Sequence, residues 1–181
     1  MKIKLANLTE DILEDIPEWA SPPYSCKYCL YWEFPAENKE LTKKAMKNIM
    51  AKKLAWLKQV QNNFGDCGSV LYVDEQPIGY AQYAPSKFMP NLVNYPILPS
   101  LDVVFISCLF IFDKKYRRAG FGTVLLCVVL ENLGKRGIKA VETIARKGSP
   151  SNPTGPVEFY LENEFIIYKD HKEFPLMRLE L

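Results

Sequence analysis

The chain has 181 residues, of which 48% are hydrophobic, 13% aromatic and 24% charged. This composition is typical of a soluble globular protein with one hydrophobic core, and it excludes a disordered or fibrous chain. The net charge of +2 is too small for the electrostatic surface of a general nucleic-acid-binding protein.

The N-terminal residues 1–7 lack the apolar run of a signal peptide, and no stretch approaches the roughly 18 apolar residues of a membrane span. We therefore expect a cytoplasmic protein that does not bind a membrane, with residues 1–181 forming a single domain. The cysteines are odd in number, and two of them fall in strongly apolar runs, where a thiol behaves as a small hydrophobic group. We expect all of them to be reduced: Cys26, Cys29, Cys67, Cys108 and Cys127.

The first third of the chain predicts a strand and two helices. A strand over about residues 3–6 precedes a short helix that Thr9 can cap. The segment from about residue 38 to residue 61 has apolar residues at helical spacing and predicts a long amphipathic helix. We interpret the lysines between them as a solvated face rather than as a site for an acidic partner. These are Lys43, Lys44, Lys47, Lys52, Lys53 and Lys58.

The rest of the chain predicts a sheet with further helices. Two strand-like runs around a short polar connection predict a hairpin, and a nearly continuous apolar run predicts a central strand covered on both faces. A buried helix, a strand, a short helix and two final strands follow. The predicted elements are 69–73, 78–83, 103–112, 122–136, 138–145, 157–163, 165–168 and 176–181. We therefore predict an α/β fold with a mixed, largely antiparallel sheet and helices on both faces.

The turn between the central strand and the next helix has the composition of an anion site. It reads Tyr116-Arg117-Arg118-Ala119-Gly120-Phe121-Gly122. Glycines let the backbone approach a ligand closely, the first N–H groups of a helix are unpaired, and the helix dipole adds positive potential. The two arginines add charged donors, which suit a pyrophosphate better than a single carboxylate.

Two other interpretations of this turn stay open at this point. The glycines can simply close a tight turn beside solvated arginines. Alternatively, the turn can bind a dinucleotide, although Leu125 stands where the third glycine of G-x-G-x-x-G is expected. Glu142 lies about 20 residues further on, as a ribose-binding acid would.

The same turn resembles the R/Q-x-x-G-x-G/A pyrophosphate loop of the GNAT superfamily of N-acetyltransferases. The strand 107–112 is similar to that family's splayed central strand, and the helix from Gly122 is similar to its cofactor helix. Residues 158–165 resemble its late F-Y-x-x-x-G-F segment. The resemblance covers about residues 69–181, whereas residues 21–35 resemble nothing general in the superfamily.

The resemblance implies acetyl-CoA as acyl donor and assigns roles to particular residues. Backbone N–H groups of the turn would bind the pyrophosphate, and the central strand would offer backbone groups to pantetheine and the thioester carbonyl. Tyr160 corresponds to the tyrosine that protonates the leaving thiolate. The implied cofactor-binding residues are Leu109, Phe110, Ile111, Arg117, Arg118, Ala119, Gly120, Phe121, Gly122, Thr123 and Asn152.

The sequence departs from the family pattern at two places. Glu164 stands where the family usually has glycine, so the path into the next strand can differ. The central strand carries no glutamate where many members place a general base. A base acting through water and an amine that arrives neutral both remain open.

Cys26-Lys27-Tyr28-Cys29 can be half of a zinc site or a redox pair. The remaining cysteines and His171 are not paired at zinc-ligand spacing, and a redox motif would open a helix after a strand, so we expect no metal. Packing among the neighbouring aromatic residues is one interpretation of the pair. The other is an acceptor pocket, in which these aromatic residues and Glu33 hold a cationic amine.

From the sequence we expect acetyl transfer from acetyl-CoA to a primary amine of a small-molecule or peptide acceptor. Two alternatives are a non-catalytic module that binds acyl-CoA or a nucleotide, and a cysteine-based redox or metal protein. Nucleic-acid and membrane partners are not expected, and a homodimer is left open.

Overall fold

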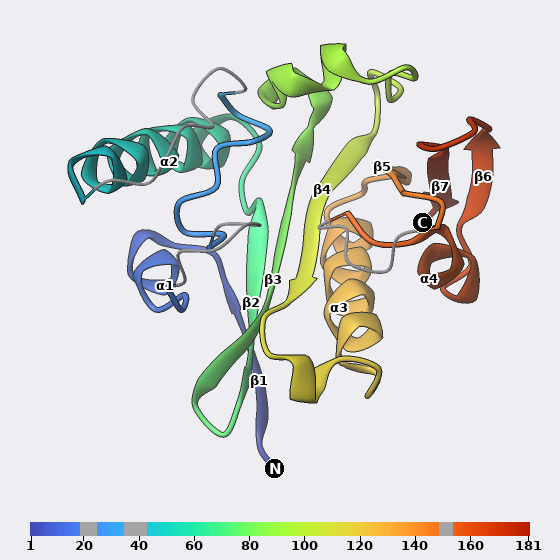
Figure 1. Cartoon of the computed structure of the whole chain (residues 1–181). Coiled ribbons are helices and arrows are strands. Elements are labelled where there is room, and N and C mark those ends of the chain that lie inside the picture. Colours follow the sequence, from blue (N-terminus) through green and yellow to red (C-terminus); the bar gives the residue numbers. More distant parts are fainter. Residues whose placement is uncertain (19–24, 35–42, 149–153) are drawn as a thin grey trace.

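The computed structural model describes residues 1–18, 25–34, 43–148 and 154–181. In these residues seven strands form one sheet in the order β1-β2-β3-β4-β5-β7-β6 (Figure 1). All neighbouring strands are antiparallel except β4 and β5, which are parallel. The strands are β1 (Ile3–Asn7), β2 (Gly68–Val73), β3 (Gln76–Pro85), β4 (Val104–Ile111), β5 (Ala140–Ile144), β6 (Ile166–Lys169) and β7 (Leu176–Glu180). The predicted mixed, largely antiparallel sheet is confirmed.

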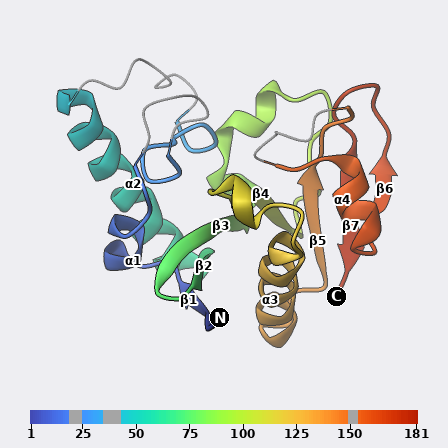
Figure 2. The ribbon, with the colours of Figure 1, turned by 60° about the horizontal axis from the view of Figure 1, so that its bottom comes forward.

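Helices cover both faces of the sheet, and each face has its own hydrophobic core (Figures 1 and 2). Helices α1 (Glu10–Glu14) and α2 (Lys43–Asn63) pack on one face, and α3 (Phe121–Lys135) and α4 (Val157–Glu162) pack on the other. As predicted, Thr9 caps α1, because its hydroxyl accepts a hydrogen bond of 3.2 Å from the Ile12 amide. In the described residues no helix is both long and apolar enough to cross a membrane.

Two predictions about helix surfaces are corrected. Lys53 of α2 is only 2% exposed, so the lysines of this helix are not all solvated. It lies on the buried stripe with Ile49 and Leu57, four residues from each. Helix α3 is buried on one side only, because it packs on one face of the sheet, and Cys127 is exposed.

The parallel strands β4 and β5 separate soon after they meet. Their pairing is limited to Val104 with Val141 and Phe105 with Glu142. At the next residue along each strand, the Thr143 hydroxyl donates to the Ile106 carbonyl at 2.8 Å. A side chain thus bonds this carbonyl, where the backbone of β5 would bond it if the pairing continued. Because β4 continues to pair with β3 up to Ile111, its last residues stay extended while β5 diverges from them. The candidate site lies where β4 diverges from β5, next to the turn that leads into α3.

Candidate active site

A cavity of about 660 Å³ lies between the end of β4, the turn into α3, and α4. Most of the residues that the sequence assigns to the cofactor line it. These are Leu109, Phe110, Ile111, Arg117, Arg118, Gly120, Gly122 and Thr123. Ala119 and Phe121 lie in the same turn without lining the cavity, and Phe121 is buried in the core. Asn152 lies outside the described residues.

The turn before α3 has the backbone shape of an anion-binding site. Gly120 is the N-cap of α3 with φ +83°, and no side chain caps the first helical N–H groups. A Cβ at Gly120 would meet no heavy atom within 4 Å, so the space beside these donors is open. At Gly122 a Cβ would lie 3.3 Å from Cε2 of Phe159, which shows how closely α3 approaches α4. The cavity and its donors therefore fit a pyrophosphate group.

The two arginines of the turn play different structural roles. The Arg117 guanidinium donates from Nε to the Ile111 carbonyl at 2.9 Å and from Nη2 to the Phe112 carbonyl at 3.2 Å. Its Cζ also lies 5.0 Å from the centre of the Phe110 ring. Arg117 thus ties the turn to the end of β4. Arg118 lines the cavity and is exposed. Because the Arg117 guanidinium is already bonded to backbone carbonyls, Arg118 is the arginine better placed to meet a phosphate.

The cavity also contains carboxylates that the sequence analysis missed. Glu158 and Glu162 line it from α4 and are exposed. Their i, i+4 spacing places both on one face of the helix, which is the signal that could have identified them. The two carboxylates lie on α4 and the two arginines precede α3, so we expect the phosphates nearer the α3 end.

Tyr160 is not among the residues that line the cavity. Its side chain is completely buried behind the lining residue Gly155, and its hydroxyl donates to the carbonyl of Thr154. The ring forms edge contacts with Phe159 and Phe165, with ring centres 5.2 and 5.1 Å away. Burial raises the pKa of Tyr160, so the phenol remains protonated at neutral pH.

Glu142 does not have the position of a ribose-binding acid. It is completely buried on β5 and accepts hydrogen bonds from the Ser100 amide at 2.7 Å and the Ser100 hydroxyl at 2.9 Å. Arg178 of β7 donates to it at 3.0 Å. These three donors satisfy the carboxylate, and the dinucleotide interpretation loses the acid that supported it.

The Cys26–Cys29 pair lies on the α2 face of the sheet, away from the cavity. The thiol of Cys26 hydrogen-bonds the thiol of Cys108 on β4, and this contact together with burial raises the pKa of Cys26. Burial raises the pKa of Cys29 to about 11. Such thiols stay protonated near neutral pH and are poor nucleophiles. In the described ranges, no three His, Cys, Asp or Glu residues are grouped as metal ligands.

Replacing Cys26 with serine is expected to leave CoA affinity unchanged and to lower the melting temperature. The buried hydroxyl costs about 1–3 kcal/mol, and the cavity lies on the opposite face of the sheet. Calorimetric titration with CoA and a thermal melt measure the two effects. Stoichiometric zinc in the purified protein that Cys26→Ser removes would instead identify the pair as metal ligands.

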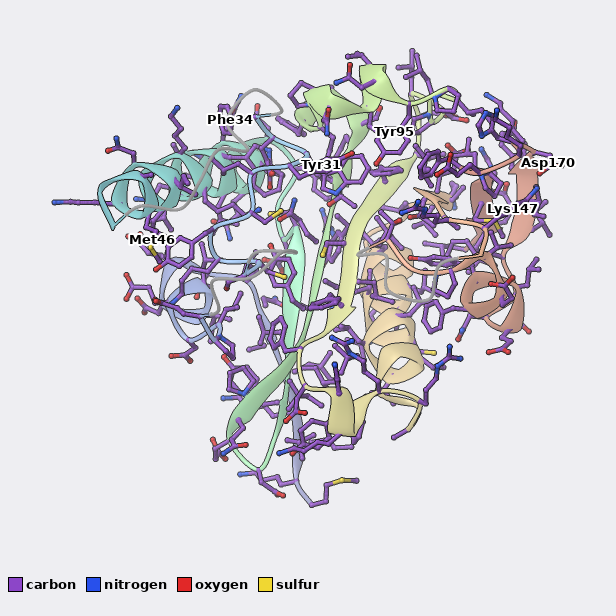
Figure 3. All side chains as sticks on the ribbon, in the orientation of Figure 1. Tyr31, Phe34, Met46, Tyr95, Lys147 and Asp170 are labelled. Carbon is purple, nitrogen blue, oxygen red and sulfur yellow. The ribbon has the colours of Figure 1, made fainter. Side chains whose placement is uncertain are left out.

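Aromatic residues from the loop 25–34, the β3–β4 connection and β4 meet on the α2 face of the sheet. Trp32 stacks on Tyr95 with ring centres 5.3 Å apart, and Phe105 contacts Trp32 at the same ring distance. The hydroxyls of Tyr31 and Tyr95 are 2.9 Å apart, and Figure 3 shows these two side chains converging from the loop 25–34 and the β3–β4 connection. Tyr31 and Trp32 of the early loop thus form a cluster with Tyr95 and Phe105, two residues that the sequence analysis did not place beside them.

Several solved structures with the same fold are named as N-acetyltransferases. PaiA N-acetyltransferase from Thermoplasma acidophilum, solved in complex with coenzyme A, matches with TM-score 0.62 and 16% identity over 100% of both chains. An N-acetyltransferase from Staphylococcus aureus Mu50 matches with TM-score 0.62 and 11% identity over 99% of both chains. The ribosomal-protein-S18-alanine N-acetyltransferase from Escherichia coli matches with TM-score 0.53 and 15% identity, over 99% of this chain and 94% of that one. No family model matches the sequence, and no curated protein matches it significantly.

The chain thus has the acyl-CoA N-acyltransferase fold of the GNAT N-acetyltransferases. The fold predicted from the turn and from the order of the elements is confirmed.

Proposed function

We propose that the protein is a GNAT-type N-acetyltransferase that uses acetyl-CoA to acetylate a primary amine of a small molecule or peptide. We include in this proposal a cytoplasmic location and a single acyltransferase domain over residues 1–181. The observation that carries it is the cavity, where the diverging end of β4 meets the uncapped N-terminus of α3 beside Arg118. Similar folds that are N-acetyltransferases, including one solved with coenzyme A, support it.

In this proposal the chain binds and orients the donor mainly through its backbone. N–H groups of residues 118–123 hold the pyrophosphate, and backbone groups of Leu109, Phe110 and Ile111 hold pantetheine and polarise the thioester carbonyl. Bound acetyl-CoA supplies the acetyl group as an activated thioester. The diverging strands β4 and β5 support this assignment, because a ladder between them would use the same backbone groups.

Tyr160 is the proposed proton donor to the leaving sulfur. Its phenol carries a proton at neutral pH, and the lining residues Gly155 and Phe159 are its direct neighbours. The hydroxyl is bonded to Thr154 in this structure, so donation to sulfur requires it to exchange that partner. The kinetic test of this role is given in the Discussion.

An acceptor screen that measures release of free CoA thiol tests the proposed activity. The screen compares small amines, amino acids and peptides with a free N-terminus or a lysine. We expect at least one class to raise CoA release above the rate in buffer and to yield an acetylated product by mass spectrometry. A protein that binds CoA tightly but transfers acetyl to none of these amines would be the non-catalytic binding module.

A further inference from the structure

Strand β6 forms one edge of the sheet, and its exposed surface is mostly apolar (Figure 1). All four of its residues are exposed, and three of them are Ile166, Ile167 and Tyr168. Ile166 is 61% exposed. Leu161 of α4 is 48% exposed, and its carbonyl accepts a hydrogen bond of 3.3 Å from the Glu164 amide just before β6. An apolar edge strand is a template for pairing with another strand, because its outer N–H and C=O groups are unpaired.

The opposite edge of the sheet, β1, is protected by charge. Lys4 lies in β1 and Lys2 directly precedes it, and both are exposed. Charged residues on an edge, lysine above all, hinder its pairing with another strand. Strand β6 carries one charged residue, Lys169 at its last position. The difference between the two edges indicates that β6 is the edge suited to pairing.

Glu164, two residues before β6, has an unusual backbone conformation. Its φ of +68° lies in the left-handed region that favours glycine, and it stands where the sequence departs from the glycine of the family pattern. Its side chain is exposed, and within the described ranges its carboxylate forms no ion pair. Because strained residues often mark functional positions, this carboxylate is a candidate for a contact outside the chain.

The two ends of β6 carry opposite charges, with Glu164 before the strand and Lys169 at its end. If two copies of β6 pair antiparallel about a two-fold axis, the acidic end of one strand meets the basic end of the other. The register of β6 with β7 shifts after Ile167, so we expect the axis to pass at Ile166 or Ile167. In either case Glu164 lies across from a direct neighbour of the partner's Lys169, within reach of its long side chain.

We propose that β6 is a dimer interface, where it pairs antiparallel with β6 of a second copy of this chain. The isoleucines of the two strands cover each other, and each Glu164 carboxylate forms an ion pair with the partner's Lys169. This two-fold contact is closed, whereas pairing of β6 with β1 of a next copy would repeat without end and would meet the lysines of β1. A ladder of four residues is small for a stable interface, so we expect Leu161 and Tyr168 to add contact area.

Sedimentation equilibrium of the wild-type protein over a range of concentrations tests for the dimer. We expect a mass twice that of the 20.8 kDa chain at micromolar concentrations. A wild-type protein that stays monomeric up to about 100 μM would overturn the inference, as would be found if β6 pairs only with a strand of a different protein. The inference does not depend on the proposed function, because among the described residues that line the cavity none belongs to β6.

The variant Ile166→Lys gives β6 the kind of protection that β1 has. We expect its dimer dissociation constant to rise about 100-fold or more, because two lysines would meet near the two-fold axis. Ile3→Lys is the matched control, since Ile3 is an isoleucine of the other edge strand, is 43% exposed, and should leave the dissociation constant unchanged. Both positions are exposed, so both variants should fold and bind CoA as the wild type does. A dissociation constant that Ile166→Lys does not change would place the interface elsewhere and overturn the inference.

Charge reversals test the antiparallel arrangement of the two strands. Glu164→Lys and Lys169→Glu should each raise the dimer dissociation constant by about tenfold or more, because each creates two like-charge contacts across the axis. The double variant Glu164→Lys/Lys169→Glu should restore the wild-type dissociation constant, since the ion pairs form again with their charges exchanged. A double variant that dimerises no better than the single variants would overturn the proposed pairing.

Discussion

Replacing Gly120 with aspartate is expected to weaken CoA binding by about tenfold or more, because the new carboxylate lies where a phosphate would lie. Gly120 is the N-cap of α3, and an aspartate there would accept hydrogen bonds from the first-turn N–H groups itself. The space beside Gly120 is open, so the fold should tolerate the side chain apart from the strain of its positive φ. Calorimetric titration of the variant with CoA measures the loss.

Gly137→Asp is a matched control for this variant. Gly137 also has a positive φ, +77°, with nothing within 4 Å of a Cβ, but it follows the C-terminal end of α3. The same charge and the same backbone strain there should lower the melting temperature and leave CoA affinity unchanged. If both aspartate variants bind CoA as tightly as the wild type, the pyrophosphate does not lie at the β4–α3 turn.

Replacing Tyr160 with phenylalanine is expected to lower kcat by roughly 10²-fold, because the leaving thiolate would lose its proton donor. CoA affinity should stay the same, because phenylalanine keeps the ring and its packing against Phe159 and Phe165. The hydrogen bond from the hydroxyl to the Thr154 carbonyl is lost, which costs about 1 kcal/mol and lowers the melting temperature by about 2–4 °C. Turnover is therefore measured well below the melting transition, with an amine that the wild type accepts.

Tyr72→Phe controls for the loss of a tyrosine hydroxyl elsewhere. The Tyr72 hydroxyl donates to Asp15 at 3.2 Å on the face that carries α1, so this variant should keep the wild-type kcat. A Tyr160→Phe variant with wild-type turnover and a lowered melting temperature would assign the hydroxyl a structural role only. Solvent would then be the proton donor.

The features that the sequence predicts well depend on local patterns. The apolar run of β4 and the apolar stripe of α3 occupy consecutive or helically spaced positions, so their patterns predict the elements. The glycines and arginines of the turn between them predict an anion site. The family resemblance of the turn suggested coenzyme A as the ligand that we propose. The structure confirms the fold and brings most of the predicted residues together around the cavity.

The features that the sequence does not predict depend on contacts between distant segments. Lys53 looks like the other lysines of α2 until Glu33 of an irregular loop and Gln82 of β3 are placed around it. Its position on the Ile49–Leu57 stripe was the only local indication of burial. Glu142 shows the opposite case, because its spacing matches a ribose-binding acid while its partners Ser100 and Arg178 fix it in the sheet.

Calorimetric titration of the wild-type protein with CoA, pantetheine and NAD is the most direct test of the claim that the β4–α3 turn binds the pyrophosphate of coenzyme A. We expect CoA to bind, pantetheine to bind about tenfold or more weakly because it lacks the pyrophosphate, and NAD to bind poorly. Equal affinity for CoA and pantetheine, or a preference for NAD, would contradict the assignment.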